Sequence, residues 1–157
     1  MDQAYEMFHE VLVKLFNDIM NIEAKAIITP EFRDITKNDM HVIEAIGIGE
    51  PKKMTEIARQ LSITTGTLTK SMNGLEKKSY VNRKRSEEDK RVVQISLTDK
   101  GVRAYHHHEN FHKILIERVT QGLSEEEIRF LIDVLGKLKD SFRINYKIGE
   151  LMNDIFS

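Results

Sequence analysis

The feature that most constrains the fold is one β-hairpin in a chain that otherwise has helical periodicity. Its returning half lies in SEEDKRVVQISLTDKG, residues 86–101, where Val93, Ile95 and Leu97 alternate with polar residues. This alternation predicts a half-buried strand. Residues 80–85 form the expected outgoing strand, and the acidic stretch after them forms the tip. The tip is too polar to be buried, so we expect the hairpin to be anchored by its base and to project as a wing.

Two short helices joined by a tight turn are expected just before the hairpin. The segment MTEIARQL has the apolar spacing of a short helix, and TTGTLTKSMNGLEKKSY places Leu68, Met72 and Leu75 on one face of a second helix. The outer face of this second helix is polar and basic, which describes a helix-turn-helix. The solvated side of any amphipathic helix has the same pattern, but the adjacent wing favours a winged helix-turn-helix over residues 36–98.

The net charge of −1 conceals an asymmetry along the chain. Residues 51–103 hold 13 Lys and Arg against 6 Asp and Glu, a net charge of +7. The remaining residues hold 11 basic against 19 acidic side chains, a net charge of −8. A basic middle segment between acidic arms indicates that the middle meets a polyanion.

The residue types of the basic segment suit double-stranded DNA. Threonine hydroxyls can meet phosphates or bases, Asn73 can pair with adenine, and Lys70 can meet guanine or phosphate. A narrow minor groove attracts an inserted arginine, and Arg91 at the wing is placed to be that residue, with Asp89 holding its guanidinium extended. The expected DNA-binding residues are Thr64, Thr65, Thr67, Thr69, Lys70, Asn73, Arg83, Arg85, Asp89, Lys90 and Arg91.

Both ends of the chain have the pattern of long amphipathic helices. Apolar residues from Phe8 to Ala26 step by four and three positions, a heptad-like seam on a helix within residues 1–29. Ser124 and Glu127 form a capping box before a second apolar face. The seams either pack within the chain or form a helical dimer interface, and we expect residues 1–29 and 124–157 to be dimerisation helices.

The expected fold is therefore mainly α with a small β-hairpin wing. It has one domain, residues 1–157, with a winged helix-turn-helix core, N- and C-terminal dimerisation helices, and a connecting helix at residues 99–121. The segment GIGEPKK is expected to be a turn, because no strand precedes it and no complete phosphate-binding loop is present.

Composition argues against several other classes of protein. The sequence has no cysteine, which excludes disulfides and thiolate zinc sites. It lacks a membrane-spanning apolar run and a signal-peptide pattern, so we expect a cytoplasmic protein with no membrane partner. An enzyme is not expected, because no cysteine nucleophile and no G-x-S-x-G motif occur. A histidine-based hydrolase or a structural coiled coil stays as an alternative that a gel shift would separate from a DNA-binding protein.

The segment from Asp89 to Gly101, D-x-R-x-x-x-I-x-L-T-x-x-G, resembles the wing motif of the MarR-type winged-helix repressors. The resemblance covers nearly all of the chain. It implies a homodimer on a pseudo-palindromic operator, with an effector site between the dimer helices and the DNA-binding lobe. Two residues depart from the family pattern: Ser79 stands where glycine is common, and Lys53 stands where a Ser or Thr helix cap is usual.

Within the family, the chain is most similar to the fatty-acid-synthesis repressors of Firmicutes. The segments that carry this likeness are MHVIEAIG, GTLTKSMNGLEKKSYV, RSEEDKRVV and FHKILIERVTQGLSEEE. It implies that a long-chain acyl group on acyl carrier protein is the corepressor, with no other cofactor. The expected effector pocket is formed by Ile19, Ile22, His41, Ile43, Ile46, His108, Phe111, His112 and Leu115.

The rival hypothesis is a zinc-sensing repressor of the same family. His108 and His112 are four residues apart on one helix, so they share a face. His41 lies on another helix, and Glu23 or Glu109 could complete a zinc site. Equally, the histidines could line the pocket or be held by hydrogen bonds without any metal.

Overall fold

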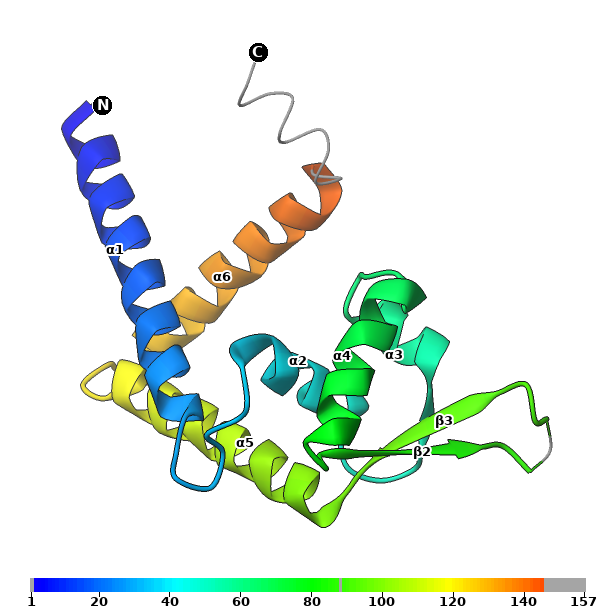
Figure 1. Ribbon diagram of the computed structural model, residues 1–157. Coiled ribbons are helices and arrows are strands. Elements are labelled where there is room, and N and C mark those ends of the chain that lie inside the picture. The colour runs from blue at the N-terminus through cyan, green and yellow to red at the C-terminus, as the bar shows by residue number, and fades with distance from the viewer. Residues whose placement is uncertain (1, 88, 146–157) are drawn as a thin grey trace. The chain divides into compact units, whose positions relative to one another are not determined.

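The structure is a computed structural model that describes residues 2–87 and 89–145. The chain divides into two compact units, residues 1–114 and 115–157. The elements, coloured along the chain in Figure 1, are α1 (Asp2–Ile27), α2 (Lys37–Ile46), β1 (Lys52–Lys53), α3 (Met54–Gln60), α4 (Thr65–Lys77), β2 (Val81–Arg85), β3 (Val93–Leu97), α5 (Asp99–Thr120) and α6 (Glu125–Asn145). The fold is mostly helical, as the sequence predicts.

The sheet has three antiparallel strands in the order β1-β3-β2. Strands β2 and β3 are the predicted wing, with Val81 opposite Leu97 and Arg85 opposite Val93. The strand β1 was not predicted: residues 47–53 were expected to be only a turn, yet Lys52 pairs with Ile95. Two lysines carry no strand pattern of their own, and pairing with the central strand imposes the extended conformation on them.

The core of the first unit lies where α2, α3 and α4 meet the base of the wing. The predicted inward residues Leu68, Met72 and Leu75 of α4 are fully buried, as is Ile95 of β3. Val93 and Leu97 are only half-buried and pack against the edge of this core. Ile95 is therefore the main residue that anchors the wing to the core.

Side-chain contacts mark the starts of α2 and α3. Thr36 accepts the backbone N–H of Asp39 at 3.1 Å, and Asp39 accepts that of Thr36 at 3.0 Å, which is a complete capping box before α2. The start of α3 has only half of one: Glu56 accepts the N–H of Lys53 at 3.0 Å, whereas the Lys53 side chain has no acceptor to offer. This confirms that α3 begins without the usual hydroxyl cap.

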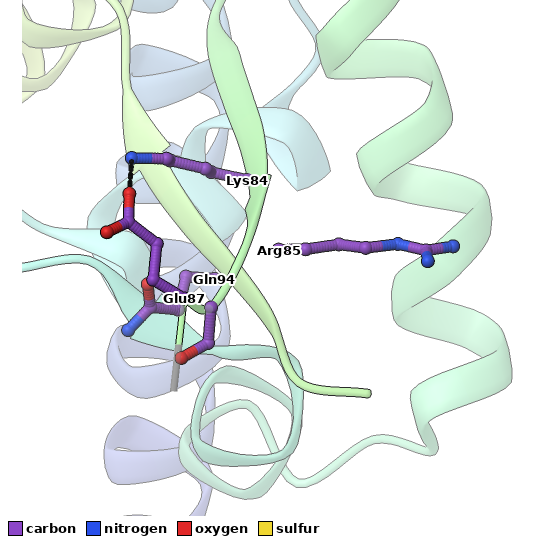
Figure 2. A pocket seen from close by; sticks show the side chains of 5 residues that line it. Lys84, Arg85, Glu87 and Gln94 are labelled. Atoms are coloured by element: carbon purple, nitrogen blue, oxygen red, sulfur yellow. Dashed lines mark hydrogen bonds and ion pairs between the residues drawn. The ribbon is translucent and has the colours of Figure 1, made fainter. Parts of the chain in front are cut away.

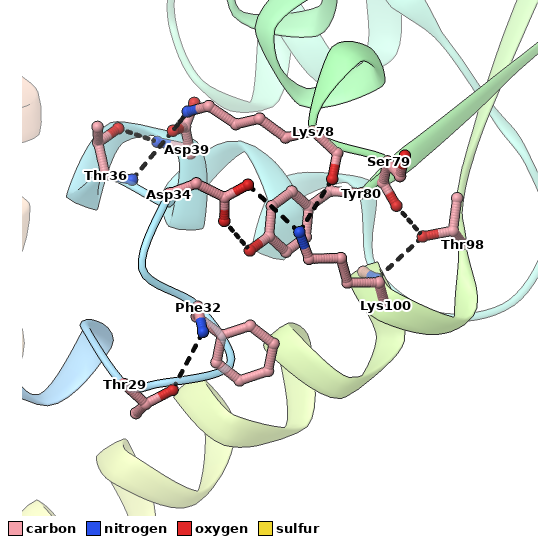
Figure 3. A network of polar contacts seen from close by, with 11 residues as sticks. Thr29, Phe32, Asp34, Thr36, Asp39, Lys78, Ser79, Tyr80, Thr98 and Lys100 are labelled. Atoms are coloured by element: carbon pink, nitrogen blue, oxygen red, sulfur yellow. Dashed lines mark hydrogen bonds and ion pairs between the residues drawn. The ribbon is translucent and has the colours of Figure 1, made fainter.

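A polar network joins the end of α4 to the start of α5 (Figure 3). The Thr98 hydroxyl donates to the Ser79 carbonyl at 2.7 Å and accepts the N–H of Gly101 at 3.1 Å. A Cβ at Gly101 would lie 2.1 Å from the carbonyl oxygen of Tyr80, so only glycine fits there. The L-T-x-x-G motif is therefore the contact that fixes the wing base against α5. Ser79 has a φ of 63°, the left-handed conformation expected where glycine is common.

The same network reaches back to the segment before α2. Tyr80 donates its hydroxyl to Asp34 at 2.8 Å, and Lys100 lies over the Tyr80 ring and contacts Asp34 at 3.3 Å. Burial, together with the hydrogen bond to Asp34, raises the pKa of Tyr80 well above its usual range. Burial acts to raise the pKa of Asp34 too, but the hydrogen bonds from Tyr80 and Lys100 outweigh it and the pKa is lowered. These contacts hold three chain segments together.

The two terminal helices carry apolar side chains that their own units leave exposed. In α1 the seam residues Phe8, Leu12, Leu15 and Ile22 are all exposed. In the second unit, Ser124 and Glu127 form the predicted capping box, and Ile132 and Leu135 of α6 are exposed. The side chain of Phe142 and residues 146–157 of the predicted final helix lie outside the described residues. No helix in the described part of the chain is long and apolar enough to cross a membrane.

Candidate nucleic-acid interface and histidine cluster

The exposed face of α4 carries the side chains that the sequence assigns to DNA. Thr65, Thr67, Thr69, Lys70 and Asn73 are all exposed, whereas the opposite face fills the core. Hydroxyls at the helix start are already ordered by local contacts. Thr64 caps α4 by accepting the N–H of Thr67 at 3.1 Å, and the two hydroxyls lie 3.0 Å apart. Thr69 donates its hydroxyl to the Thr65 carbonyl at 2.7 Å, so it can offer DNA its oxygen lone pairs and its methyl group.

Arg83 differs in placement from the other predicted DNA-binding residues, because it is tied to α4. Its Nη2 donates to Asn73 Oδ1 at 2.7 Å, and its Nε lies 3.3 Å from Glu76 Oε2. Its side chain is only 25% exposed. Glu76 was not singled out from the sequence, although its position three residues after Asn73 puts it on the same helix face.

The wing tip carries Arg91 in the geometry that the sequence predicts. Asp89 Oδ1 accepts both the backbone N–H and the Nε of Arg91, at 3.0 and 3.2 Å, and its Oδ2 lies 3.4 Å from Nη2. Hydrogen bonds from the Arg91 backbone and side chain lower the pKa of Asp89 below its usual value. The Arg91 side chain remains 91% exposed. The carboxylate therefore orients the guanidinium without covering it.

The end of strand β2 adds further charged side chains to the wing (Figure 2). Lys84 donates to Glu87 at 2.9 Å, and these residues line a shallow hollow of about 240 Å³ together with Arg85, Ser86 and Gln94. The Arg85 side chain extends away from the Lys84–Glu87 pair in Figure 2. Arg85 and Lys90 are exposed, so their charges remain available to phosphates.

Four acidic and histidine side chains converge where α1, α2 and α5 meet. His108 Nε2 lies 3.1 Å from His112 Nε2, 3.3 Å from Glu44 Oε1 and 3.6 Å from Glu23 Oε1. Ligand atoms of Glu23, His108 and His112 all lie within 4.8 Å of one another, a spacing that could hold a metal ion. Glu44 was missed from the sequence, although it stands three residues after His41 on the same helix.

The electrostatics of this histidine cluster are set by burial. Burial lowers the pKa of His108, with His112 and His41 acting in the same direction and the two carboxylates opposing them. Glu23 is also buried, yet its ion pair with Lys37 at 2.6 Å lowers its pKa. The buried Nδ1 of His108 has no hydrogen-bond partner among the described residues. A neutral His108 that carries its proton on Nε2, facing the carboxylates, fits this arrangement.

The other residues that the sequence assigns to the effector pocket do not all line one common surface. His41 Nδ1 lies 3.6 Å from Glu44, and Phe111 stacks on His108 with ring centroids 6.0 Å apart. Ile19 is half-buried, Ile22 is exposed, and Ile43 and Ile46 belong to the core. Leu115 lies in the second unit. Glu109 points to a different partner, because it pairs with the exposed His106 at 3.2 Å.

Comparisons with known proteins agree with this geometry. The family described as transcriptional regulator SarA/Rot matches residues 24–107. FabT of Streptococcus pneumoniae, solved in complex with DNA, superposes with a TM-score of 0.83 and 36% identity over 90% of this chain and 99% of FabT. The transcriptional regulator PchR of Bacillus subtilis is 27% identical over 94% of this chain and 95% of its own length. SarZ of Staphylococcus haemolyticus is 41% identical over a shorter stretch, 44% of this chain and 47% of SarZ.

Proposed function

The chain belongs to the MarR/SarA-type winged-helix transcriptional regulators, and we propose that it represses fatty-acid-synthesis genes as a homodimer on a pseudo-palindromic operator. The family and the fold are those of DNA-binding regulators rather than of enzymes. The observation that carries the DNA-binding role is Arg91, exposed at the wing and oriented by Asp89. An extended arginine is the side chain that a narrow minor groove attracts, while α4 offers its polar face to the major groove.

The exposed seam of α1 supports the homodimer. Phe8, Leu12, Leu15 and Phe16 are all exposed within one chain, and an apolar patch of this kind marks an interaction site. The heptad-like spacing of the seam is the pattern that packs against a second helix. A second copy of this chain is the proposed occupant, with the apolar residues of α6 contributing to the same dimer.

The fatty-acid role rests on resemblance. The chain resembles the fatty-acid-synthesis repressors of Firmicutes, and the similarity to FabT supports the same subfamily. We propose that a long acyl chain carried by acyl carrier protein is the corepressor and that it binds beside α1, α2 and α5. Each methylene that leaves water contributes about 0.8 kcal/mol, so a site that holds only part of the chain gives useful affinity.

Zinc sensing is a second candidate function, and the histidine cluster favours it. The ligand atoms of Glu23, His108 and His112 are close enough for one ion, and the ligand types suit zinc. Two features oppose tight binding. Lys37 already neutralises Glu23, and ligation through His108 Nε2 would move its proton to the buried, unpartnered Nδ1. A ligating histidine normally donates that second N–H to a partner.

One titration series separates these functions. The affinity of the purified protein for its operator, selected from promoter fragments, is measured alone, with a long-chain acyl carrier protein, with zinc and with a chelator. Tighter binding with the acyl ligand and no response to zinc is the expected result, because a ligand that favours the DNA-binding state shifts the population toward it. Tightening by zinc that the chelator reverses, without an acyl response, would replace the fatty-acid role by metal sensing.

A further inference from the structure

We propose that Arg83 sets the hydrogen-bonding polarity of Asn73, so that Asn73 offers DNA its amide NH2 group and selects guanine or thymine instead of adenine. This inference deepens the proposed DNA-binding function and rests on it. It changes the role that the sequence suggests for both residues. Asn73 becomes a specificity residue that reads an acceptor, and Arg83 becomes the positioning residue that orients it.

The Arg83 side chain contacts two residues of α4. Asn73 and Glu76 lie three residues apart on α4, and both contact Arg83 of the neighbouring strand β2, at 2.7 and 3.3 Å. Arg83 lies opposite Ile95, the fully buried residue of β3. Its side chain is therefore part of the junction between α4 and the wing and is only 25% exposed.

The chemistry of arginine then decides which end of the Asn73 amide faces it. A guanidinium has five N–H donors and no acceptor, so the Asn73 atom that contacts it must be the oxygen. The nitrogen is the end left for another partner, and Asn73 is exposed on the face of α4 that is proposed to meet the major groove. Because a charged donor polarises the amide, the NH2 group becomes a stronger donor and the oxygen a weaker second acceptor.

This polarity discriminates among bases. Asparagine reads adenine by donating to N7 and accepting from N6 at the same time. An amide oxygen that already accepts from Arg83 makes the accepting half of that pair weaker. Guanine presents two acceptors, N7 and O6, and thymine presents O4, whereas cytosine presents only a donor. The preferred base facing Asn73 is therefore guanine or thymine.

The test is a selection from a random duplex library, carried out with the full chain. Wild type, Arg83→Met, Asn73→Ala and Arg85→Met are compared for the base preference at each operator position. Asn73→Ala identifies the position that Asn73 reads, because the preference there disappears. Arg83→Met retains the apolar stem while freeing the Asn73 oxygen, so at that position the preference should shift toward adenine by at least about fivefold. Arg85→Met removes the same charge from the same strand and should weaken binding at every sequence without this shift.

The outcomes separate the inference from the proposed function. Arg83→Met with an unchanged base preference at the Asn73 position overturns the inference, and so does a wild type that prefers adenine there. A wild type that enriches no sequence overturns the proposed DNA-binding function instead. If circular dichroism shows that Arg83→Met is unfolded, Glu76→Gln is the deciding variant. It weakens the contact that positions Arg83 without removing the arginine. That variant should shift the preference in the same direction by a smaller factor, and no shift would refute the orienting role.

Discussion

Asp89 Oδ1 accepts two hydrogen bonds from Arg91, one from its backbone N–H at 3.0 Å and one from its Nε at 3.2 Å. The two residues thus form a closed local turn that holds the exposed guanidinium of Arg91 in place. Arg91→Ala should weaken operator binding by about 1–3 kcal/mol, as measured by fluorescence anisotropy. Asp89→Ala should weaken it less, because Asp89 orients Arg91 and touches no DNA in this arrangement.

Two controls accompany this prediction. The thermal midpoint of Arg91→Ala should match that of wild type, since the side chain is 91% exposed and exposed ion pairs contribute little to stability. Arg91→Lys retains the charge but lacks the planar fork, so its affinity should lie between wild type and Arg91→Ala. Wild-type affinity in Arg91→Ala would show that the wing does not contact the operator.

Gly101→Ala should destabilise the fold. Its Cβ would lie 2.1 Å from the carbonyl oxygen of Tyr80, and relieving such an overlap costs about 1–3 kcal/mol. Gly74→Ala is the matched control, because nothing lies within 4 Å of the added Cβ in α4 and alanine favours a helix over glycine by roughly 1 kcal/mol. Urea unfolding should therefore give opposite signs for the two variants. A neutral Gly101→Ala would mean that the wing base does not pack against α5 in this way.

Ser79→Gly should stabilise the protein by up to about 1 kcal/mol, because φ is 63° at this residue and glycine adopts that conformation without a Cβ clash. Ser71→Gly, in the interior of α4, serves as the control and should destabilise the protein by up to about 1 kcal/mol. Both changes are measured by thermal or urea unfolding. A loss of stability in Ser79→Gly would indicate that the Ser79 side chain makes a contact worth more than the strain.

Leu15→Glu should dissociate the proposed dimer. Burying a leucine contributes about 1.5–3 kcal/mol, and a symmetric dimer loses two, so its dissociation constant should rise by at least about 100-fold. Asn17→Glu adds the same charge on the opposite face of α1 and should leave the dimer intact at micromolar concentration in sedimentation. In the proposed dimer, the two recognition helices meet major grooves about 10 base pairs apart. A wild type that sediments as a monomer and still binds one half-site tightly would contradict this arrangement.

The sequence predicted those parts of the fold that depend on local pattern. The alternation at Val93, Ile95 and Leu97 predicts which face of β3 is buried, and the capping box of Ser124 and Glu127 predicts the start of α6. Strand β1 was missed because its extended conformation comes from pairing with β3, which Lys52 and Lys53 do not encode locally.

In the candidate site, the sequence predicted contacts between neighbours along the chain but not contacts between separate elements. Asp89 and Arg91 are two positions apart, so their hydrogen bond could be foreseen. Arg83 and Asn73 lie on different elements, and no periodicity relates them. Likewise, the helical spacing of His108 and His112 predicts their proximity, whereas their contact with Glu44 depends on how α2 packs against α5.

The stability of the fold around the histidine cluster should decrease as pH falls. Burial lowers the pKa of His108 below its ordinary value of 6.5. Between the folded pKa and 6.5 the unfolded chain binds a proton that the folded chain does not, so the free energy of unfolding must fall as pH falls through this window. The contribution of His108 is fully present above about pH 6.5. Each pH unit inside the window removes at most about 1.4 kcal/mol.

The measurement is urea unfolding at pH 7.5 and 5.5, at one protein concentration and with a chelator present to exclude metal. His108→Gln cannot titrate, so it should lose less stability between the two pH values than wild type. His106→Gln removes an exposed histidine from the same helix and should keep the wild-type difference. Glu23, Glu44, His41 and His112 face His108 in both the wild type and this control. Equal pH dependence in wild type and His108→Gln would mean that folding leaves the pKa of His108 unchanged, so that burial does not favour its neutral form.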